Sequence, residues 1–226
     1  QLLIEKRVDG IILASGFQES ATIDPLSMGS IPIVSLCTRF ENAKKSFVVI
    51  DNERGGFIAT KHLIEQGYPT IGFIGTQGDG LFQGPRFKGY LQALEKFNIL
   101  FDARFVFSGD LKRETGYEII NRIIADQNFP RALFVENVLM ALGVIQGIRE
   151  SGLRVPDDIA VVGFDDIAFA SFPEIGLTTV RQPKYEMGKL AASILLDCII
   201  KATKEPKKHI LEPKLIVRTS SCRPVE

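Results

Sequence analysis

The chain of 226 residues is 45% hydrophobic, so it can bury a substantial core, either as one large domain or as two smaller lobes. Lys plus Arg and Asp plus Glu each number 27, which excludes a strong net charge that would favour nucleic acid or an anionic membrane surface. No apolar run approaches the ~20 residues that span a bilayer.

Cysteine and histidine are too sparse and too scattered to indicate a disulfide framework or a metal site. Cys37, Cys198 and Cys222 lie far apart and form no CxxC motif, which is typical of a reducing cytoplasm. The two histidines, His62 and His209, lack a partner at metal-ligand spacing. We therefore expect no metal, no cofactor and a cytoplasmic location.

The N-terminal stretch QLLIEKRVDGIIL contains neither an initiator Met nor a signal-peptide pattern. Leu2, Leu3 and Ile4 have the character of a helix that is already under way. We expect the sequence to begin within a fold, so the lack of a targeting segment says little about the complete protein.

Short apolar runs, rich in β-branched and aromatic residues, recur along the chain and are predicted to be strands. Their hydrophobicity is continuous rather than alternating, which suits strands buried on both faces of a parallel sheet. The seven runs are GIILA (10–14), IPIVSL (31–36), FVVID (47–51), TIGFIG (70–75), RFVFSG (104–109), RALFVE (131–136) and DIAVVGF (158–164).

Helical patterns lie between several of these runs. In residues 186–200 and 139–150, apolar side chains recur at i, i+3, i+4 and i+7, which makes one apolar stripe on a helix. Gly67 and Gly152 are predicted to end helices, because prolines follow both shortly afterwards. Strands that alternate with helices predict a doubly wound α/β fold. Since no low-complexity linker divides the chain, two lobes would be joined by strands or short crossovers.

The sequence offers little for an enzyme. The glycines of GFIGTQGDG do not have the GxGxxG spacing, and neither GxxxxGK[ST] nor GxSxG occurs. Asp165 and Asp166 are adjacent, and adjacent residues of an extended chain point to opposite faces, so they are not expected to share a catalytic proton. We predict that the chain is not an enzyme and has no catalytic residues.

Residues that follow strands are the natural candidates for a ligand site, because open α/β sheets bind ligands outside the carboxyl ends of their strands. Arg86 lies in or near the first turn of the helix after TIGFIG, and its guanidinium, an amide and a carboxylate suit a polar, hydroxylated small molecule. The strand-end candidates are Ser15, Cys37, Leu111, Asn137 and Asp165.

Each candidate also has a purely structural interpretation. Asp166 is predicted to cap a short helix at IAFASF rather than to contact a ligand. Asn137 could equally cap the helix LMALGVIQGIRE, and Arg86 could be a solvated helix charge. Cys37 and Leu111 could simply contribute to packing.

Several segments together resemble the effector-binding core of the lactose/galactose repressor family of bacterial transcription regulators. They occur in the family's order and span nearly the whole chain. The segments are VVIDNERGGFIATKHLIEQGYPTIGFIG, RFKGYLQAL, LMALGVIQGIRESG, GLRVPDDIAVVGFDDIAFASFPEIGLTTVRQPKYEMGKLA and LEPKLIVRTSS.

The resemblance implies a type I periplasmic-binding-protein-like fold, with two doubly wound parallel-sheet lobes and a ligand in the cleft between them. Residues 1–50 plus 184–210 would form the N-terminal lobe, whose first strand and helix would lie upstream. Residues 51–183 plus 211–226 would form the C-terminal lobe. The resemblance also implies a homodimeric repressor that binds operator DNA through a helix-turn-helix domain preceding this segment, and no membrane partner.

The resemblance further assigns roles to individual residues. Arg86 in GPRFKGY matches an arginine that grips the ligand, and Asp165 in GFDD an aspartate that bonds ligand hydroxyls or ring nitrogens. Asn137 in VEN matches an asparagine at the lobe interface, and Lys184 falls near a further contact position.

Some positions depart from the family's pattern. The family often has an aspartate at Cys37 and an aromatic residue at Leu111, while a small residue and an acid are common at Glu136 and Val138. Losing a carboxylate removes two acceptor sites, and losing an aromatic ring removes a flat apolar face. These departures argue against the usual simple sugars as effectors.

The predicted function is therefore the effector-binding core of a regulator that senses a sugar- or nucleoside-like metabolite. The alternatives are a solute-binding protein of a sugar transporter, which an upstream signal peptide would indicate, and an enzyme, which would need a general base.

Overall fold

The computed structural model describes residues 6–14, 31–37, 39, 45–76, 84–201 and 205–222. The chain divides into two compact units. The first unit comprises residues 1–51 and 183–212, and the second comprises residues 52–182 and 213–226. The chain therefore crosses between the units three times, after Asp51, Gln182 and Glu212.

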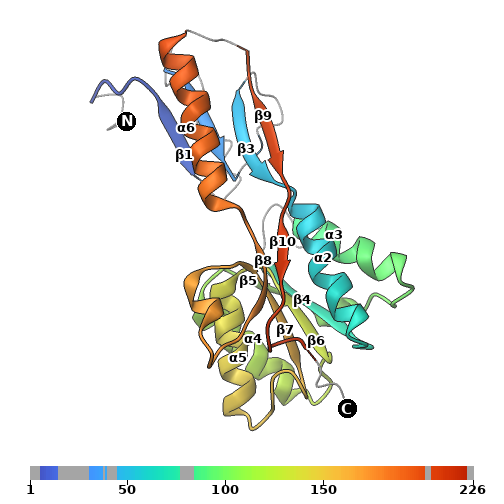
Figure 1. Cartoon of the computed structure of the whole chain (residues 1–226). Helices are drawn as coiled ribbons and strands as arrows, with labels where there is room; N and C mark the ends of the chain where they lie inside the picture. The colour runs from blue at the N-terminus through green and yellow to red at the C-terminus, as the bar shows by residue number, and fades with distance from the viewer. Residues whose placement is uncertain are drawn as a thin grey trace. The chain divides into compact units, whose positions relative to one another are not determined.

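The first unit contains a parallel sheet of four strands in the order β1-β2-β3-β9. Helix α6 (Lys184–Ile200) packs against β1, β2 and β3, and Figure 1 shows it alongside the sheet. Its buried side chains belong to the predicted apolar stripe, so the predicted helix over 186–200 is confirmed. The strands are β1 (Ile11–Ala14), β2 (Ile33–Leu36), β3 (Ser46–Ile50) and β9 (Lys208–Leu211).

The second unit contains a sheet of six strands in the order β10-β8-β7-β6-β4-β5. All neighbours are parallel except the edge strand β10, which runs antiparallel to β8. The strands are β4 (Ile71–Thr76), β5 (Val106–Gly109), β6 (Ala132–Val135), β7 (Ala160–Asp165), β8 (Thr178–Arg181) and β10 (Lys214–Ile216).

Helix pairs cover the two faces of this sheet (Figure 1). Successive side chains of β4 point to opposite faces of the sheet. Phe73 contacts the rings of Phe87 and Tyr90 in α3, whereas Ile74 belongs to the apolar cluster built by α4 and α5. The helices are α2 (Asn52–Glu65) and α3 (Pro85–Lys96) on one face, and α4 (Arg113–Ala125) and α5 (Val138–Glu150) on the other. The doubly wound α/β prediction is therefore confirmed.

The crossing of α2 and α3 depends on two glycines. A Cβ atom at Gly56 would lie 2.0 Å from the carbonyl oxygen of Arg86, and one at Gly89 would lie 2.0 Å from that of Glu53. Neither glycine can therefore be replaced while the backbones stay in contact. This crossing fixes the first turn of α3, which carries Arg86, against the start of α2.

All seven predicted strands form, with boundaries that differ by one or two residues. Strands β8, β9 and β10 were not predicted from the hydrophobic pattern, because TTVR and KHIL are partly polar and KLI is only three residues long. The predicted helix ends are confirmed. Gly67 and Gly152 have φ angles of +77° and +78°, and their amides donate to Ile64 and Arg149.

Candidate functional site

The carboxyl edge of the six-stranded sheet contains a topological switch point. The chain runs from β4 outward to β5 and then returns to the other side of β4 with β6. Ligands of open α/β sheets bind outside the carboxyl ends of the two strands that flank such a point. Here those ends are Thr76 on β4 and Glu136 directly after β6.

Arg86 lies in the first turn of α3 and is held above this edge by several contacts. Its Nε donates to Oδ1 of Asn52 at 2.9 Å, and its Nη1 donates to the carbonyl oxygen of Glu136 at 2.6 Å. Its Cζ lies 3.7 Å from the ring centroid of the buried Phe164, which adds a cation–π contact. Only 18% of the side chain is exposed, so the solvated-charge interpretation of Arg86 is wrong.

Asp165 is the last residue of β7 and lies beside Arg86. Its Oδ1 is 3.7 Å from Nη2 of Arg86 and also accepts a hydrogen bond from the amide of Gln182, which follows β8. Its φ angle is +95°, a left-handed conformation that a non-glycine residue adopts only when its surroundings impose it. The structure thus brings two of the predicted site residues, Arg86 and Asp165, into one charged pair.

The prediction that Asp166 caps the next helix is wrong. The short 3-10 helix spans Ala168–Ser171 and has Ile167 at its N-cap, without a side-chain cap. The carboxylate of Asp166 instead pairs with Arg181 Nε at 2.6 Å and with Arg218 Nη2 at 2.8 Å, and only 6% of the side chain is exposed.

Two physical reasons explain this correction. Asp165 and Asp166 both have positive φ angles, so the chain is not extended here and does not lead directly into the helix. In addition, two guanidinium groups bind a buried carboxylate more strongly than a helix end does. Burial acts to raise the pKa of Asp166, but the hydrogen bonds from Arg181 and Arg218 outweigh it, and the pKa lies below its ordinary value.

Asn137 uses its amide within the fold. Its Oδ1 accepts from the backbone amide of Met140 at 2.9 Å, so the prediction that it caps α5 is confirmed. Its Nδ2 donates to the carbonyl oxygen of Leu111 at 2.8 Å. Leu111 has a φ angle of +69° and packs against the core cluster of α4 and α5. Ligand contact by either residue remains a prediction.

Glu136 is absent from the predicted site residues, although it lies at the switch point. Its Oε2 accepts hydrogen bonds from the backbone amide of Thr76 at 2.5 Å and from Oγ1 of Thr76 at 3.0 Å. The sequence carried a signal for it, since an acid directly after the buried run RALFV lies at a strand end.

The other predicted site residues lie elsewhere. Cys37 directly follows β2 with a φ angle of +72°, and Lys184 is the first residue of α6, so both belong to the first unit. Both are exposed. Ser15 lies outside the described residues.

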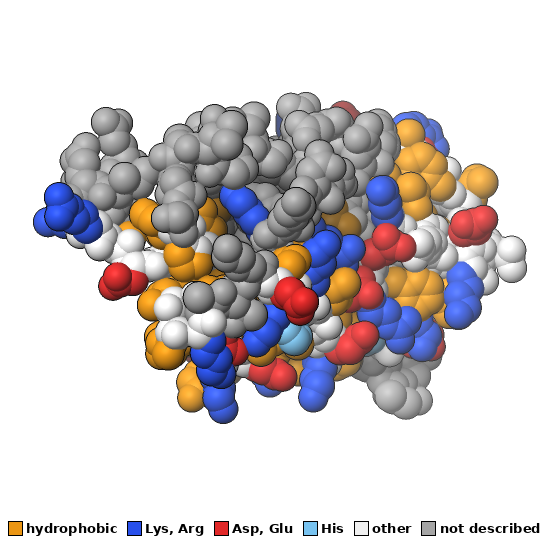
Figure 2. Space-filling view, turned by 90° about the horizontal axis from the view of Figure 1, so that it is seen from above, with side chains coloured by type: hydrophobic (Ala, Val, Ile, Leu, Met, Phe, Trp, Pro, Cys, Tyr) orange, Lys and Arg blue, Asp and Glu red, His pale blue; other side chains and the backbone are white. Residues whose placement is uncertain are grey.

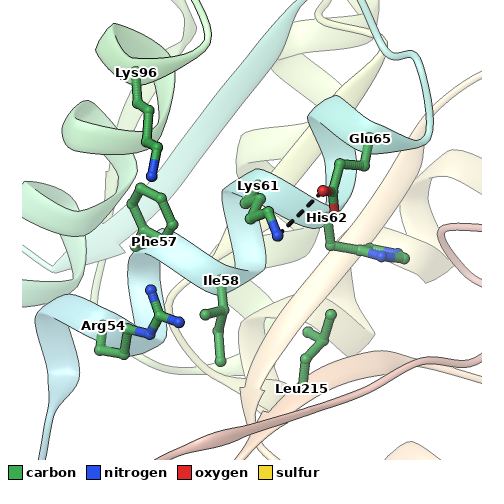
Figure 3. Close-up of a pocket in the computed structure, with 8 residues that line it drawn as sticks. All are labelled: Arg54, Phe57, Ile58, Lys61, His62, Glu65, Lys96 and Leu215. Atoms are coloured by element: carbon green, nitrogen blue, oxygen red, sulfur yellow. Dashed lines mark ion pairs between the residues drawn. The ribbon is translucent and has the colours of Figure 1, made fainter.

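A separate hollow of about 280 Å³ lies on the second unit between α2, the end of α3 and β10 (Figure 3). It includes none of the predicted site residues. Burial lowers the pKa of His62, which outweighs the opposite effect of Glu65, and the Nε2 of His62 lies 2.7 Å from Oγ of Ser221. The lining residues are Arg54, Phe57, Ile58, Lys61, His62, Glu65, Lys96 and Leu215.

The surface charges of the described residues are mixed. On the face shown in Figure 2, Lys and Arg side chains are interspersed with Asp and Glu side chains. Within the described ranges, His, Cys, Asp and Glu form no group of three that could hold a metal ion. In the same part of the chain, every helix is too short or too polar to cross a membrane.

Comparison with known proteins identifies the kind of protein to which this fold and edge belong. The family described as "Periplasmic binding protein-like domain" matches residues 60–221. The HTH-type transcriptional repressor PurR of Mannheimia succiniciproducens is 33% identical over 97% of this chain. The chain spans 66% of the length of that repressor.

Solved structures agree with this match. The transcriptional regulator CelR in complex with cellobiose is 34% identical, with a TM-score of 0.86 over 97% of this chain and 68% of that one. The lac repressor dimer bound to operator and the anti-inducer ONPF is 25% identical, with a TM-score of 0.84 over 98% of this chain and 66% of that one.

The fold is thus that of the periplasmic-binding-protein-like proteins. More narrowly, the chain belongs to the lactose/galactose repressor family and corresponds to its effector-binding core. The relatives are transcriptional regulators, which are not enzymes. The transporter hypothesis and the enzyme hypothesis are therefore not favoured.

Proposed function

We propose that this chain is the effector-sensing part of a DNA-binding transcriptional regulator, and that the carboxyl edge of its six-stranded sheet contacts a small polar metabolite. The observation that carries the proposal is the Arg86–Asp165 pair beside the switch point, with Arg86 held by Asn52, the Glu136 carbonyl and Phe164. A guanidinium that is already oriented loses little side-chain entropy when a ligand binds.

The chemistry of this edge suits a hydroxylated ligand. Carboxylate oxygens of Asp165 accept hydrogen bonds from ligand hydroxyls, and the guanidinium of Arg86 donates to ring or hydroxyl oxygens. CelR, which was solved with cellobiose, supports a sugar-like effector for a relative of this chain. A nucleoside-like effector has the same donors and acceptors in its ribose.

Regulation would require the effector to bind one conformation of the protein more tightly than another, because equal affinity shifts no equilibrium. We propose that the two compact units act as the two lobes of an effector-binding protein, with Ser15, Cys37 and Lys184 contributing from the first lobe. The protein would work in the cytoplasm as a homodimer, a state supported by the operator-bound dimer of the lac repressor.

DNA recognition would be the task of a part of the protein outside these 226 residues. The PurR relative is named as HTH-type and is longer than this chain. The equal numbers of acidic and basic residues fit this division of labour. The purified chain should show no sequence-selective affinity for duplex DNA in a fluorescence-anisotropy titration, and selective binding would contradict the division.

The site assignment is tested with Arg86→Ala. A panel of cellobiose, glucose, ribose, adenosine and guanosine is first screened by thermal shift, because a ligand in excess of its Kd raises the apparent stability. For each ligand that binds, calorimetry should show an affinity loss on the order of 100-fold in Arg86→Ala, since charge-assisted hydrogen bonds are lost.

Lys61→Ala, in the hollow beside α2, is the matched control and should bind like the unmodified chain. Unchanged affinity in Arg86→Ala, with a retained urea midpoint, would show that the carboxyl edge is not the effector site.

A further inference from the structure

The part of the proposed site that lies on the second unit contains more negative than positive charge. Two carboxylates, Glu136 and Asp165, lie at the ends of the neighbouring strands β6 and β7. The guanidinium of Arg86 faces the carboxylate of Asp165 and the backbone carbonyl of Glu136. Asp110 also lies at this end of the sheet, but its pair with Lys112 at 2.6 Å is neutral as a whole. The formal charge of the three central groups is therefore −1.

The guanidinium of Arg86 is already hydrogen-bonded and paired with a carboxylate within the protein. Its Nε and one Nη1 proton are bonded to Asn52 and to the Glu136 carbonyl, and its Nη2 faces Asp165. Asp165 thus offsets the cation before a ligand arrives. The guanidinium can still donate from its remaining N–H groups, but it does not present an excess positive charge.

The carboxylate of Glu136 is oriented by one of its oxygens only. Oε2 accepts both hydrogen bonds from Thr76, while Oε1 has no hydrogen-bond partner among the residues that the structure describes. Gly75 makes this position possible, because a Cβ atom there would lie 2.8 Å from Oε2. The half-buried carboxylate is therefore fixed on one side by Thr76, and none of the described residues uses the acceptor capacity of Oε1.

The cations of the adjoining β8 and C-terminal segment, Arg181 and Arg218, are already paired with Asp166.

We propose that this edge selects a neutral or cationic polyhydroxylated effector, with an amino sugar as the favoured class, and rejects phosphorylated or carboxylated ones. Glu136 is the residue that determines this specificity. A ligand ammonium or several hydroxyls would donate to Glu136 and Asp165, whereas a ligand anion would meet, on the second unit, two fixed carboxylates and one guanidinium that is already paired. The inference rests on the proposed function, because it concerns the same site.

The experiment uses ligands that share one sugar ring and differ in a single charged substituent. Glucose, glucosamine and glucose 6-phosphate form one set, and galactose, galactosamine and galactose 6-phosphate form a second. Binding to the whole chain is measured by calorimetry at constant pH and ionic strength. Within a set, we expect the amino sugar to bind at least as tightly as the neutral sugar, and the phosphate at least 10-fold more weakly.

Glu136→Gln separates the charge of this residue from its shape. It keeps an oxygen that accepts from Thr76 but removes the negative charge. We expect it to weaken amino-sugar binding at least 5-fold and to reduce the difference in affinity between the neutral and the phosphorylated ligand. Glu118→Gln, an exposed position on α4, is the matched control and should leave all affinities unchanged.

The results separate the proposed ligand class from the proposed effector site. If a sugar phosphate binds as tightly as its neutral partner, or if Glu136→Gln leaves the affinity ratios unchanged, the ligand class is wrong while the effector site stands. If none of the six ligands binds, both the ligand class and the sugar-sensing form of the proposed function are contradicted.

Discussion

The two faces of helix α2 differ in how firmly the charged side chains beside them are held by the fold. One face, with Gly55 and Gly56, packs against Phe164 and against the backbone of Arg86. The other face, with Phe57 and Lys61, lines the hollow shown in Figure 3. The first face lies beside Arg86, whose guanidinium is held above the Phe164 ring, and the second face carries the exposed pair of Lys61 and Glu65.

The distances and exposures make the difference clear. Arg86 lies 3.7 Å above the Phe164 ring, with 18% of its side chain exposed and two short hydrogen bonds. Lys61 pairs with Glu65 at 3.1 Å, but 41% and 54% of the two side chains are exposed. Water and salt screen the second pair, whereas the first is partly shielded by the protein. An ion pair is therefore weak evidence for a site unless the fold also fixes the orientation of its cation.

Gly56→Ala should disrupt the packed face of α2 and lower the free energy of unfolding more than the other substitutions proposed below. The new Cβ would lie 2.0 Å from the Arg86 carbonyl oxygen, so α2 and α3 must separate. We expect a loss of about 3 kcal/mol in the free energy of unfolding, measured with urea.

Gly84→Ala is the matched control for this change. Gly84 has a φ angle of −62°, and a Cβ atom there would meet no atom of the described residues within 4 Å. Its effect should stay within about 0.5 kcal/mol. Similar effects of the two substitutions would contradict the close crossing of α2 and α3.

Asp166→Asn should lower the free energy of unfolding by an intermediate amount that depends on pH. At neutral pH it leaves Arg181 and Arg218 without their shared anion, which should cost about 2 kcal/mol. Because the pKa of Asp166 is lowered in the folded state, its contribution is present above the unfolded-state pKa and is lost as the pH falls towards the folded-state pKa.

The urea midpoints of the original chain and Asp166→Asn should therefore differ most at pH 7 and converge below about pH 4. A difference that does not change between these pH values would show that the carboxylate charge contributes nothing. Asp157→Asn, whose pair with the exposed Arg154 is 3.2 Å long, provides a surface comparison.

Lys61→Ala should change the free energy of unfolding least. Its exposed i, i+4 pair with Glu65 is expected to contribute no more than about 0.5 kcal/mol. Urea unfolding at low and high salt measures it, and a salt-sensitive loss above 1 kcal/mol would mean that the hollow is also a fixed electrostatic site.

Local sequence patterns were sufficient for much of the fold. The continuous apolar runs predicted seven strands, and glycines with the freedom to adopt positive φ marked the ends of two helices. The position of Arg86 in the first turn of α3 also follows from the sequence, since Pro85 begins that helix. These features depend on residues only a few positions apart.

The partners of the charged residues were not predictable in this way. Asp166 was assigned to the adjacent helix, but its partners are 15 and 52 residues away along the chain. Glu136 is not among the predicted site residues, because Thr76, which orients it, is 60 residues away and becomes its neighbour only when β4 pairs with β6.

The sequence by itself therefore determined the strands, the main helices and the set of polar residues at the strand ends. Only the tertiary structure decided which of those residues meet, because β-sheet order brings together side chains from distant segments. Two adjacent acids at the end of β7 consequently have separate roles in the fold. Asp165 faces Arg86, and Asp166 is bound between Arg181 and Arg218.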